Sequence, residues 1–181
     1  MPTLEGTTRT AFLCFFLSHI PITLVIDGQA FFPRRFYPQV LRDVVDWYAI
    51  TFKDKLMTHP PQPWFTSLVA IEILLQMPFF FVAVYAILQK QKNDTNTLNQ
   101  NGRSIIEGNG IFRSLCMVYG SSTATSLIPI FASILTDDGT TLREKGILLC
   151  FYFPYFIFPL WLVVIAVCEE NVFGSKSKKR E

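Results

Sequence analysis

Long apolar segments alternate with polar loops along this chain. Four of the apolar segments run over about residues 10–26, 65–88, 111–135 and 146–167. A helix needs about 20 residues to cross the hydrocarbon core of a bilayer, and each segment is near that length. Backbone polar groups in lipid must be hydrogen-bonded internally, so the segments are predicted to be helices. The pattern predicts an all-α membrane protein, a four-transmembrane-helix bundle that forms a single domain over residues 1–181.

Proline occurs in every predicted span. The residues are Pro21, Pro78, Pro129, Pro154 and Pro159. Each removes a backbone hydrogen bond and tends to kink its helix. Kinked helices pack imperfectly at mid-depth, so we expect a cavity among them.

Composition agrees with a membrane protein and narrows its chemistry. Half of the residues are hydrophobic and 17% are charged, whereas soluble domains carry about 25% charged residues. A net charge of +2 is too small to indicate a nucleic-acid partner. The cysteines lie in or beside apolar runs without metal-ligand spacing, so we expect small buried side chains and no metal or cofactor; they are Cys14, Cys116, Cys150 and Cys168.

The distribution of basic residues predicts the orientation. An even number of spans puts both termini on one side, together with nine basic residues: Arg9, Lys90, Lys92, Arg103, Arg113, Lys176, Lys178, Lys179 and Arg180. The other side has seven: Arg34, Arg35, Arg42, Lys53, Lys55, Arg143 and Lys145. The excess favours cytosolic termini and a cytosolic basic tail over residues 168–181.

The end of the chain, Lys178-Lys179-Arg180-Glu181, carries a candidate address signal. Two lysines at the third and fourth positions from a cytosolic carboxyl end match the dilysine signal that returns membrane proteins to the endoplasmic reticulum. The alternative is an ordinary positive tail. We expect an endoplasmic reticulum membrane protein.

Ionisable groups at membrane depth are the main candidates for a site. Asp27 ends the first span, and Glu72 lies inside the second with Gln76 four residues on. A charge at a helix centre costs about 2.5–3.5 kcal/mol on insertion scales, so the carboxyls should turn inward. A close pair can share one proton and hold one negative charge. Such a pair would bind a lipophilic cation or a ligand hydroxyl.

Simpler interpretations stay open for the same residues. Glu72 and Gln76 could make interhelical hydrogen bonds without any ligand, and Asp27 could cap the turn at Gly28. His19 lies about 12 Å along the helix from Asp27, so it is expected to bond a neighbouring helix, with a catalytic proton role as the alternative. Tyrosines could supply aromatic walls with hydroxyl groups or be ordinary packing; they are Tyr119, Tyr152 and Tyr155.

Several segments carry a family resemblance. In order they are FLSHIPITLVIDGQAFFPRRFYP, WYAITFKDKLM, EILLQMPFFFVAVYA, SLIPI and YFPYFIFP. They resemble the sigma-2 receptor branch of the EXPERA domain family, which has fungal members and includes, more distantly, the emopamil-binding sterol isomerase. The resemblance covers nearly the whole chain. It implies a four-helix bundle of the endoplasmic reticulum membrane, often a homodimer, with a pocket that opens toward membrane lipid and binds sterols and lipophilic amines.

The resemblance also implies roles for single residues. Asp27 matches the acid that pairs with a ligand amine, and Glu72 matches the acid beside it. Asp54 matches an acid that supports binding through structure. Ser126 stands where the vertebrate receptor has threonine. The remaining pocket-lining matches are Gln76, Tyr119, Tyr152 and Tyr155, and His19 is a further ligand-binding candidate from its place in the first span.

These observations together predict a non-enzymatic receptor that acts in sterol homeostasis or in the trafficking of a membrane-protein partner. One alternative is a sterol Δ8–Δ7 isomerase, which is disfavoured because the third span has no histidine or acid at depth. Another is an adaptor that handles mitochondrial precursors at the surface of the reticulum, as fungal relatives are linked to such handling.

The predicted orientation can be tested at Asn93-Asp94-Thr95, a glycosylation sequon between the second and third spans. It would face the cytosol and stay unmodified. Endoglycosidase treatment of protein expressed in eukaryotic cells should therefore leave its electrophoretic mass unchanged. A mass shift that Asn93→Gln abolishes would show the opposite orientation.

Overall fold

The computed structural model describes residues 4–95, 110–168 and 172–173, with the backbone alone at 91–95. The longer helices are α1 (Gly6–Val25), α2 (Gln39–Phe52), α3 (Pro63–Ile71), α4 (Met77–Thr95), α5 (Gly110–Thr136) and α6 (Leu142–Cys168). The shorter turns of helix are η1 (Asp27–Ala30), η2 (Arg34–Phe36), η3 (Lys55–Met57) and η4 (Glu72–Gln76).

The predicted fold class is confirmed. Within the described ranges there is no strand, and four helical segments are long and apolar enough to cross a membrane: Gly6–Ala30, Pro63–Lys90, Gly110–Thr136 and Leu142–Cys168. Each predicted span lies inside one of these segments, which extend a few residues further at both ends. One helix of the bundle is bent. The chain is therefore a multi-pass membrane protein.

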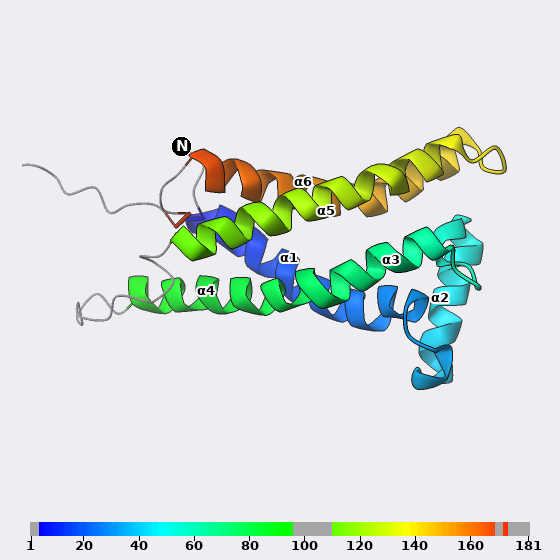
Figure 1. The fold of residues 1–181 in the computed structure, drawn as a ribbon, viewed down its shortest axis with the longest axis horizontal. Helices are drawn as coiled ribbons and strands as arrows, with labels where there is room; N and C mark the ends of the chain where they lie inside the picture. Colours follow the sequence, from blue (N-terminus) through cyan, green and yellow to red (C-terminus); the bar gives the residue numbers. More distant parts are fainter. Residues whose placement is uncertain (1–3, 96–109, 169–171, 174–181) are drawn as a thin grey trace, which may run out of the picture.

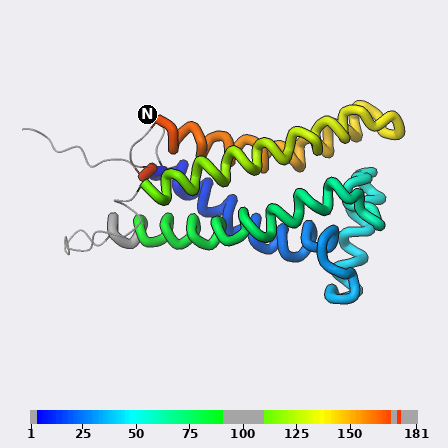
Figure 2. The backbone as a smooth tube through the Cα atoms, viewed as in Figure 1, coloured from blue at the N-terminus to red at the C-terminus, as the bar shows by residue number. Residues whose placement is uncertain are grey.

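The helices are arranged as two side-by-side units (Figures 1 and 2). Helices α5 and α6 form a long antiparallel hairpin, and α1 packs on α4. The start of α1, the end of α4, the start of α5 and the end of α6 lie at one end of the molecule. Helix α2 lies across the other end, beside the turn that joins α5 to α6.

The second span contains a wide turn that the sequence pattern did not predict. Between α3 and α4, residues Glu72–Gln76 form a π-helical turn, and the Met77 N–H donates to the carbonyl of Glu72 five residues earlier. Pro78, which has no N–H to donate, follows directly. Single π turns inside α-helices occur frequently at functional sites, and this one contains both Glu72 and Gln76.

Two apolar clusters form the core, one toward each end of the bundle. The first includes Phe12, Phe16, Phe80, Leu162 and Ile165 and lies toward the chain termini. The second includes Val45, Phe65, Val69, Leu127 and Ile130 and lies toward α2. Polar residues, among them His19, Glu72, Gln76 and Thr123, occur in the intervening turns of the helices. A layer that contains buried polar groups thus lies between the two apolar clusters.

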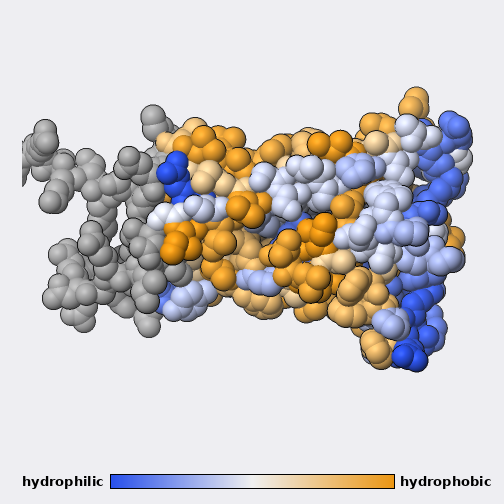
Figure 3. Space-filling model, in the orientation of Figure 1, coloured by the Kyte–Doolittle hydropathy of each residue, from blue (hydrophilic) through white to orange (hydrophobic). Residues whose placement is uncertain are grey.

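The outer surface is suited to lipid over the middle of the bundle. Hydrophobic residues cover most of that zone in the view of Figure 3, and hydrophilic residues gather at the end that carries α2. Large apolar side chains such as Leu74, Leu75 and Val118 point outward and are exposed. In water this would be an aggregation hazard, whereas in a bilayer these side chains meet acyl chains.

Two ion pairs join the segment after α2 to the α5–α6 turn and to the first turn of α6. The ammonium of Lys53 lies 2.8 Å from a carboxyl oxygen of Glu144, and that of Lys55 lies 2.5 Å from Asp137. The contact with Lys55 lowers the pKa of the Asp137 carboxyl from its usual value. Asp54, between these two lysines, is fully buried. In this segment the lysine side chains therefore reach the surface, while the aspartate side chain points into the protein.

Helices α5 and α6 approach each other closely at Gly120. A Cβ atom at this position would lie 2.5 Å from the carbonyl oxygen of Pro159 and 2.5 Å from a methyl group of Val163. The first neighbour is backbone and cannot rotate away. A glycine is therefore needed for this packing, whereas Gly146 on α6 has no atom within 4 Å of an added Cβ.

Alanine substitution at these two glycines should have opposite effects. Gly120→Ala should lower the free energy of unfolding by about 1–3 kcal/mol because the hairpin must open to admit the methyl group. Gly146→Ala should be neutral or stabilising by up to about 1 kcal/mol, since alanine favours the helix. Thermal unfolding in nanodiscs, followed by tryptophan fluorescence, measures both. Equal stability of the two variants would contradict the close approach.

Candidate functional site

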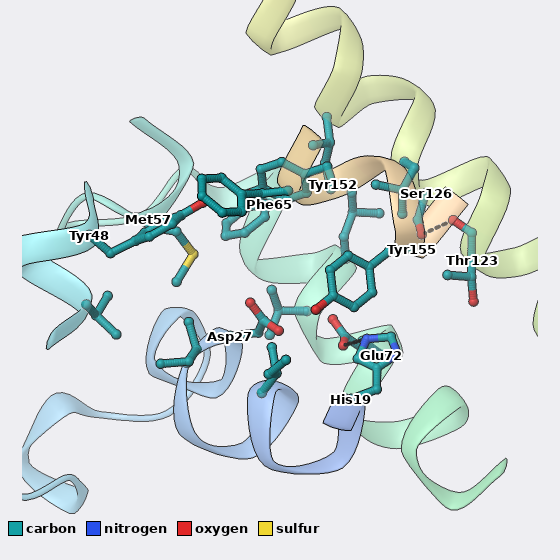
Figure 4. A pocket seen from close by; sticks show the side chains of 18 of the residues that line it. His19, Asp27, Tyr48, Met57, Phe65, Glu72, Thr123, Ser126, Tyr152 and Tyr155 are labelled. Atoms are coloured by element: carbon teal, nitrogen blue, oxygen red, sulfur yellow. Dashed lines mark hydrogen bonds and ion pairs between the residues drawn. The ribbon is translucent and has the colours of Figure 1, made fainter. Parts of the chain in front are cut away.

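A cavity of about 310 Å³ lies between the spans and under α2 (Figure 4). Its walls are mostly apolar and include Ile22, Val45, Phe65, Leu68, Val69 and Leu127. The polar groups in its lining are His19, Asp27, Tyr48, Glu72, Gln76, Thr123, Ser126, Tyr152 and Tyr155. The cavity thus brings together side chains from α1, α2, α5, α6 and the π turn that are far apart in the sequence.

Glu72 is held by the first helix. Its Oε1 accepts a hydrogen bond from the hydroxyl of Thr23 at 2.6 Å. The same oxygen lies 3.2 Å from Nε2 of His19. His19 therefore bonds a neighbouring helix, as the sequence indicated. The Glu72 side chain is about one-fifth exposed, at 18%, so its carboxyl is anchored on one side and open to the cavity on the other.

Gln76 joins the second span to the third. The Thr123 hydroxyl lies 3.0 Å from Oε1 of Gln76 and 2.9 Å from the carbonyl oxygen of Tyr119. Ser126 in turn donates to the carbonyl of Thr123 at 2.9 Å. The sequence left two interpretations for Glu72 and Gln76, interhelical hydrogen bonding or a place in the site. The structure shows the hydrogen bonds, and the same residues also line the cavity.

Asp27 is in a different position from Glu72. It is the first residue of η1, which follows α1 almost directly. No hydrogen bond or ion pair to its carboxyl exists among the residues that the structure describes. In Figure 4 the carboxyl points into the cavity, toward Glu72 and the hydroxyl of Tyr155. An acidic group without a protein partner thus faces an apolar space.

Asp54 lies behind the aromatic wall. Its Oδ2 accepts hydrogen bonds from the hydroxyls of Tyr152 at 2.8 Å and Tyr48 at 3.2 Å. Its Oδ1 accepts from the Leu56 N–H at 3.0 Å. Burial raises the pKa of the Asp54 carboxyl, against the opposing effect of these hydrogen bonds, and raises the pKa of the Tyr48 hydroxyl. Asp54 does not line the cavity, and it orients two tyrosines that do.

Tyr119 was predicted to line the pocket, but it lies in the apolar core instead. Its ring stacks on Phe79 with centroids 4.5 Å apart, within the apolar cluster toward the chain termini, and it is not among the lining residues. Tyr152 and Tyr155 do line the cavity. Lys178 and Lys179, the candidate retrieval signal, lie outside the described residues.

Sequence reasoning missed several residues of this region. Thr23 and Thr123 hold the two polar residues of the π turn, and Trp47, Tyr48 and Met57 cover the cavity from the side of α2. A signal for Thr23 was present, because it follows His19 by four residues and therefore shares its helix face. Nothing in the pattern distinguished the others from ordinary interfacial residues.

The lining of the cavity is chemically suited to a mostly apolar molecule that carries one polar group. Among the residues described, no three histidine, cysteine or acidic side chains are close enough to hold a metal ion. Two carboxyls and three tyrosine hydroxyls provide charge and hydrogen bonding within an apolar enclosure. Small-molecule sites commonly combine apolar walls with a few such polar groups.

Comparisons with known proteins give a consistent result. The sequence profile of the EXPERA (EXPanded EBP superfamily) family matches residues 40–166. "Sigma intracellular receptor 2" from Xenopus tropicalis is 34% identical, over 94% of this chain and 94% of its own length. The protein of that name from Homo sapiens is 36% identical, over 92% and 91%. "Efficient mitochondria targeting-associated protein 19" from Saccharomyces cerevisiae is 25% identical, over 85% and 94%.

The raised pKa of Asp54 predicts how stability depends on pH. A carboxyl whose pKa is higher in the folded than in the unfolded state binds more protons when the protein is folded. The free energy of unfolding therefore decreases as the pH rises from the unfolded-state pKa through the folded-state pKa. Asp54→Asn cannot ionise and should flatten the decline in melting temperature as the pH rises above about 4, the usual pKa of an aspartate. Asp137→Asn is the matched control, because the lowered pKa of Asp137 makes stability fall toward acid instead. An unchanged slope in Asp54→Asn would contradict this assignment.

Proposed function

Because this chain belongs to the EXPERA superfamily, we propose that it is an intramembrane receptor for lipophilic amines and sterols. Named relatives that it matches over most of their length are called receptors. The cavity volume, about 310 Å³, is within the range of small-molecule sites, about 300–1,000 Å³. Its apolar walls suit a rigid hydrocarbon body, and its polar groups suit one amine or hydroxyl.

The observation that carries this proposal is the carboxyl of Asp27. It faces the cavity without a described protein partner (Figure 4), while Glu72 is already hydrogen-bonded to Thr23. A charge in an apolar site is costly unless it is paired. An ammonium group of a ligand would supply the missing partner, and the surrounding hydrocarbon would exclude the water that weakens such a pair. A sterol hydroxyl would use the same carboxyl as a hydrogen-bond acceptor.

The cell-biological part of the proposal rests on the sequence. We place the protein in the endoplasmic reticulum membrane with both termini in the cytosol, supported by the excess of basic residues on that side and by the dilysine pattern at Lys178 and Lys179. Ligand binding would regulate sterol handling or the trafficking of a membrane-protein partner, and the receptor could work as a homodimer. A role in mitochondrial precursor handling is the alternative suggested by the name of the yeast relative.

A second candidate function is sterol double-bond isomerisation. The contact between His19 Nε2 and Glu72 Oε1, at 3.2 Å, places two groups able to exchange protons in the cavity wall. General acid–base catalysis needs groups of this kind within reach of the substrate. Formation of a Δ7 sterol from a Δ8 sterol by the purified protein would favour this function, whereas reversible binding without turnover favours the receptor.

Neutralising Asp27 should abolish amine binding. Asp27→Asn removes the charge while keeping the shape, and truncating one partner of a buried charge pair costs about 2–5 kcal/mol. Binding of tritiated N-(3-phenylpropyl)piperidine in nanodiscs should therefore weaken at least about 30-fold. Binding of a tritiated sterol, which carries no charge, should weaken less.

Asp43→Asn on the exposed side of α2 is the matched control and should bind both probes as the wild type does. Equal affinity of Asp27→Asn and wild type for the amine would contradict the proposed role of Asp27.

A further inference from the structure

The hydroxyl of Thr23 donates a hydrogen bond to a residue outside its own helix. A threonine inside a helix commonly bonds the carbonyl four residues earlier on its own helix, as Thr123 does with Tyr119 at 2.9 Å. Thr23 instead donates to Oε1 of Glu72 at 2.6 Å, across 49 residues of sequence. It is fully buried, at 0% exposure, and it is not part of the cavity lining.

His19 reinforces this contact from one helical turn earlier. Its Nε2 lies 3.2 Å from the same Oε1. The imidazole ring is held between the rings of Phe80 and Tyr155, with centroid distances of 4.5 and 4.6 Å. The other ring nitrogen, Nδ1, is buried without a hydrogen-bond partner. The polar contact of the imidazole is therefore made by Nε2, and its partner is Glu72.

Both contacts fall on one oxygen of the carboxyl. Oε2 of Glu72 has no hydrogen-bond partner among the described residues, and in Figure 4 the carboxyl faces the cavity beside Tyr155. A glutamate side chain has several rotatable bonds, so an unheld Glu72 could turn away from a ligand or toward Asp27. Two contacts from α1 remove that freedom before a ligand arrives, and such preorganisation raises affinity.

We propose that Thr23 is a positioning residue of the binding site, which acts with His19 to fix Glu72 so that its free oxygen and the Asp27 carboxyl together face the ligand. The inference rests on the proposed function. It separates the tasks of the two acids: Asp27 binds the charged group of the guest, and Glu72 is a fixed part of the wall that gives the guest a second polar contact.

Thr23 is the residue at which this can be tested cleanly. A substitution of His19 would also change the cavity surface, because His19 lines the cavity. Thr23 does not, so its effect on binding has to pass through Glu72. Thr23→Val keeps the shape and removes the hydroxyl, and Thr23→Ser keeps the hydroxyl. Thr10→Val is the matched control, because Thr10 is an exposed threonine of the same helix.

The experiment measures the affinity of each variant in nanodiscs for tritiated N-(3-phenylpropyl)piperidine, together with its melting temperature. Loss of a hydrogen bond to a carboxylate should weaken binding about 10-fold in Thr23→Val. Thr23→Ser should stay within about 2-fold of the wild type, and so should Thr10→Val. Rescue by serine is the decisive result, because a purely structural role of the threonine methyl group would not give it.

Three outcomes overturn the proposal. Wild-type affinity in Thr23→Val shows that the hydroxyl is not needed, and weak binding by Thr23→Ser shows that the methyl group matters instead. In both cases Asp27→Asn still loses binding, and the proposed function stands. Absence of amine binding by the wild type contradicts both the role of Thr23 and the proposed receptor function. Should Thr23→Val not fold, the pair Thr23→Ser and Thr23→Ala differs by the same hydroxyl, and the serine variant should bind about 10-fold more tightly.

Discussion

A carboxyl inside an apolar bundle requires hydrogen-bond donors, and the way Glu72 obtains them organises this structure. The donor comes from Thr23 on α1, so the first and second spans are fixed in rotation relative to each other. The next polar residue, Gln76, is in hydrogen-bond contact with Thr123 on α5, which fixes the third span. Each of these three spans therefore has one side that must face the same layer, and apolar clusters lie on either side of that layer.

Polar interhelical contacts carry this role because hydrophobicity cannot. Lipid tails are as apolar as leucine, so burial alone does not tell a membrane helix which side to turn inward. The π-helical turn at Glu72–Gln76 also contributes to these interhelical contacts. It lies directly before Pro78, where the regular hydrogen-bonding pattern is interrupted in any case, and it contains both residues that bond to neighbouring helices.

Much of the fold could be predicted from the sequence, because hydropathy over about 20 residues is a strong signal. The acids were found for the same reason, since a carboxyl at depth is conspicuous. The π turn was not, because a wide turn and a regular one have the same hydropathy. Partners were missed too, because the contact between Thr23 and Glu72 depends on the rotation of two helices about their axes. Tyr119 and Tyr155 are both tyrosines inside predicted spans, and hydropathy does not show which of them lines the cavity.

The tight contact at Gly120 has a mechanical consequence. With the backbone of α5 against the Pro159 carbonyl, the two halves of that hairpin cannot slide or separate without losing their packing. Helix α1 and α4 form the opposite unit. These two units meet along a seam that the Thr123–Gln76 contact bridges. A change in the width of the bundle would therefore alter the distance between the two units at this seam, while the spacing of α5 and α6 at Gly120 stayed the same.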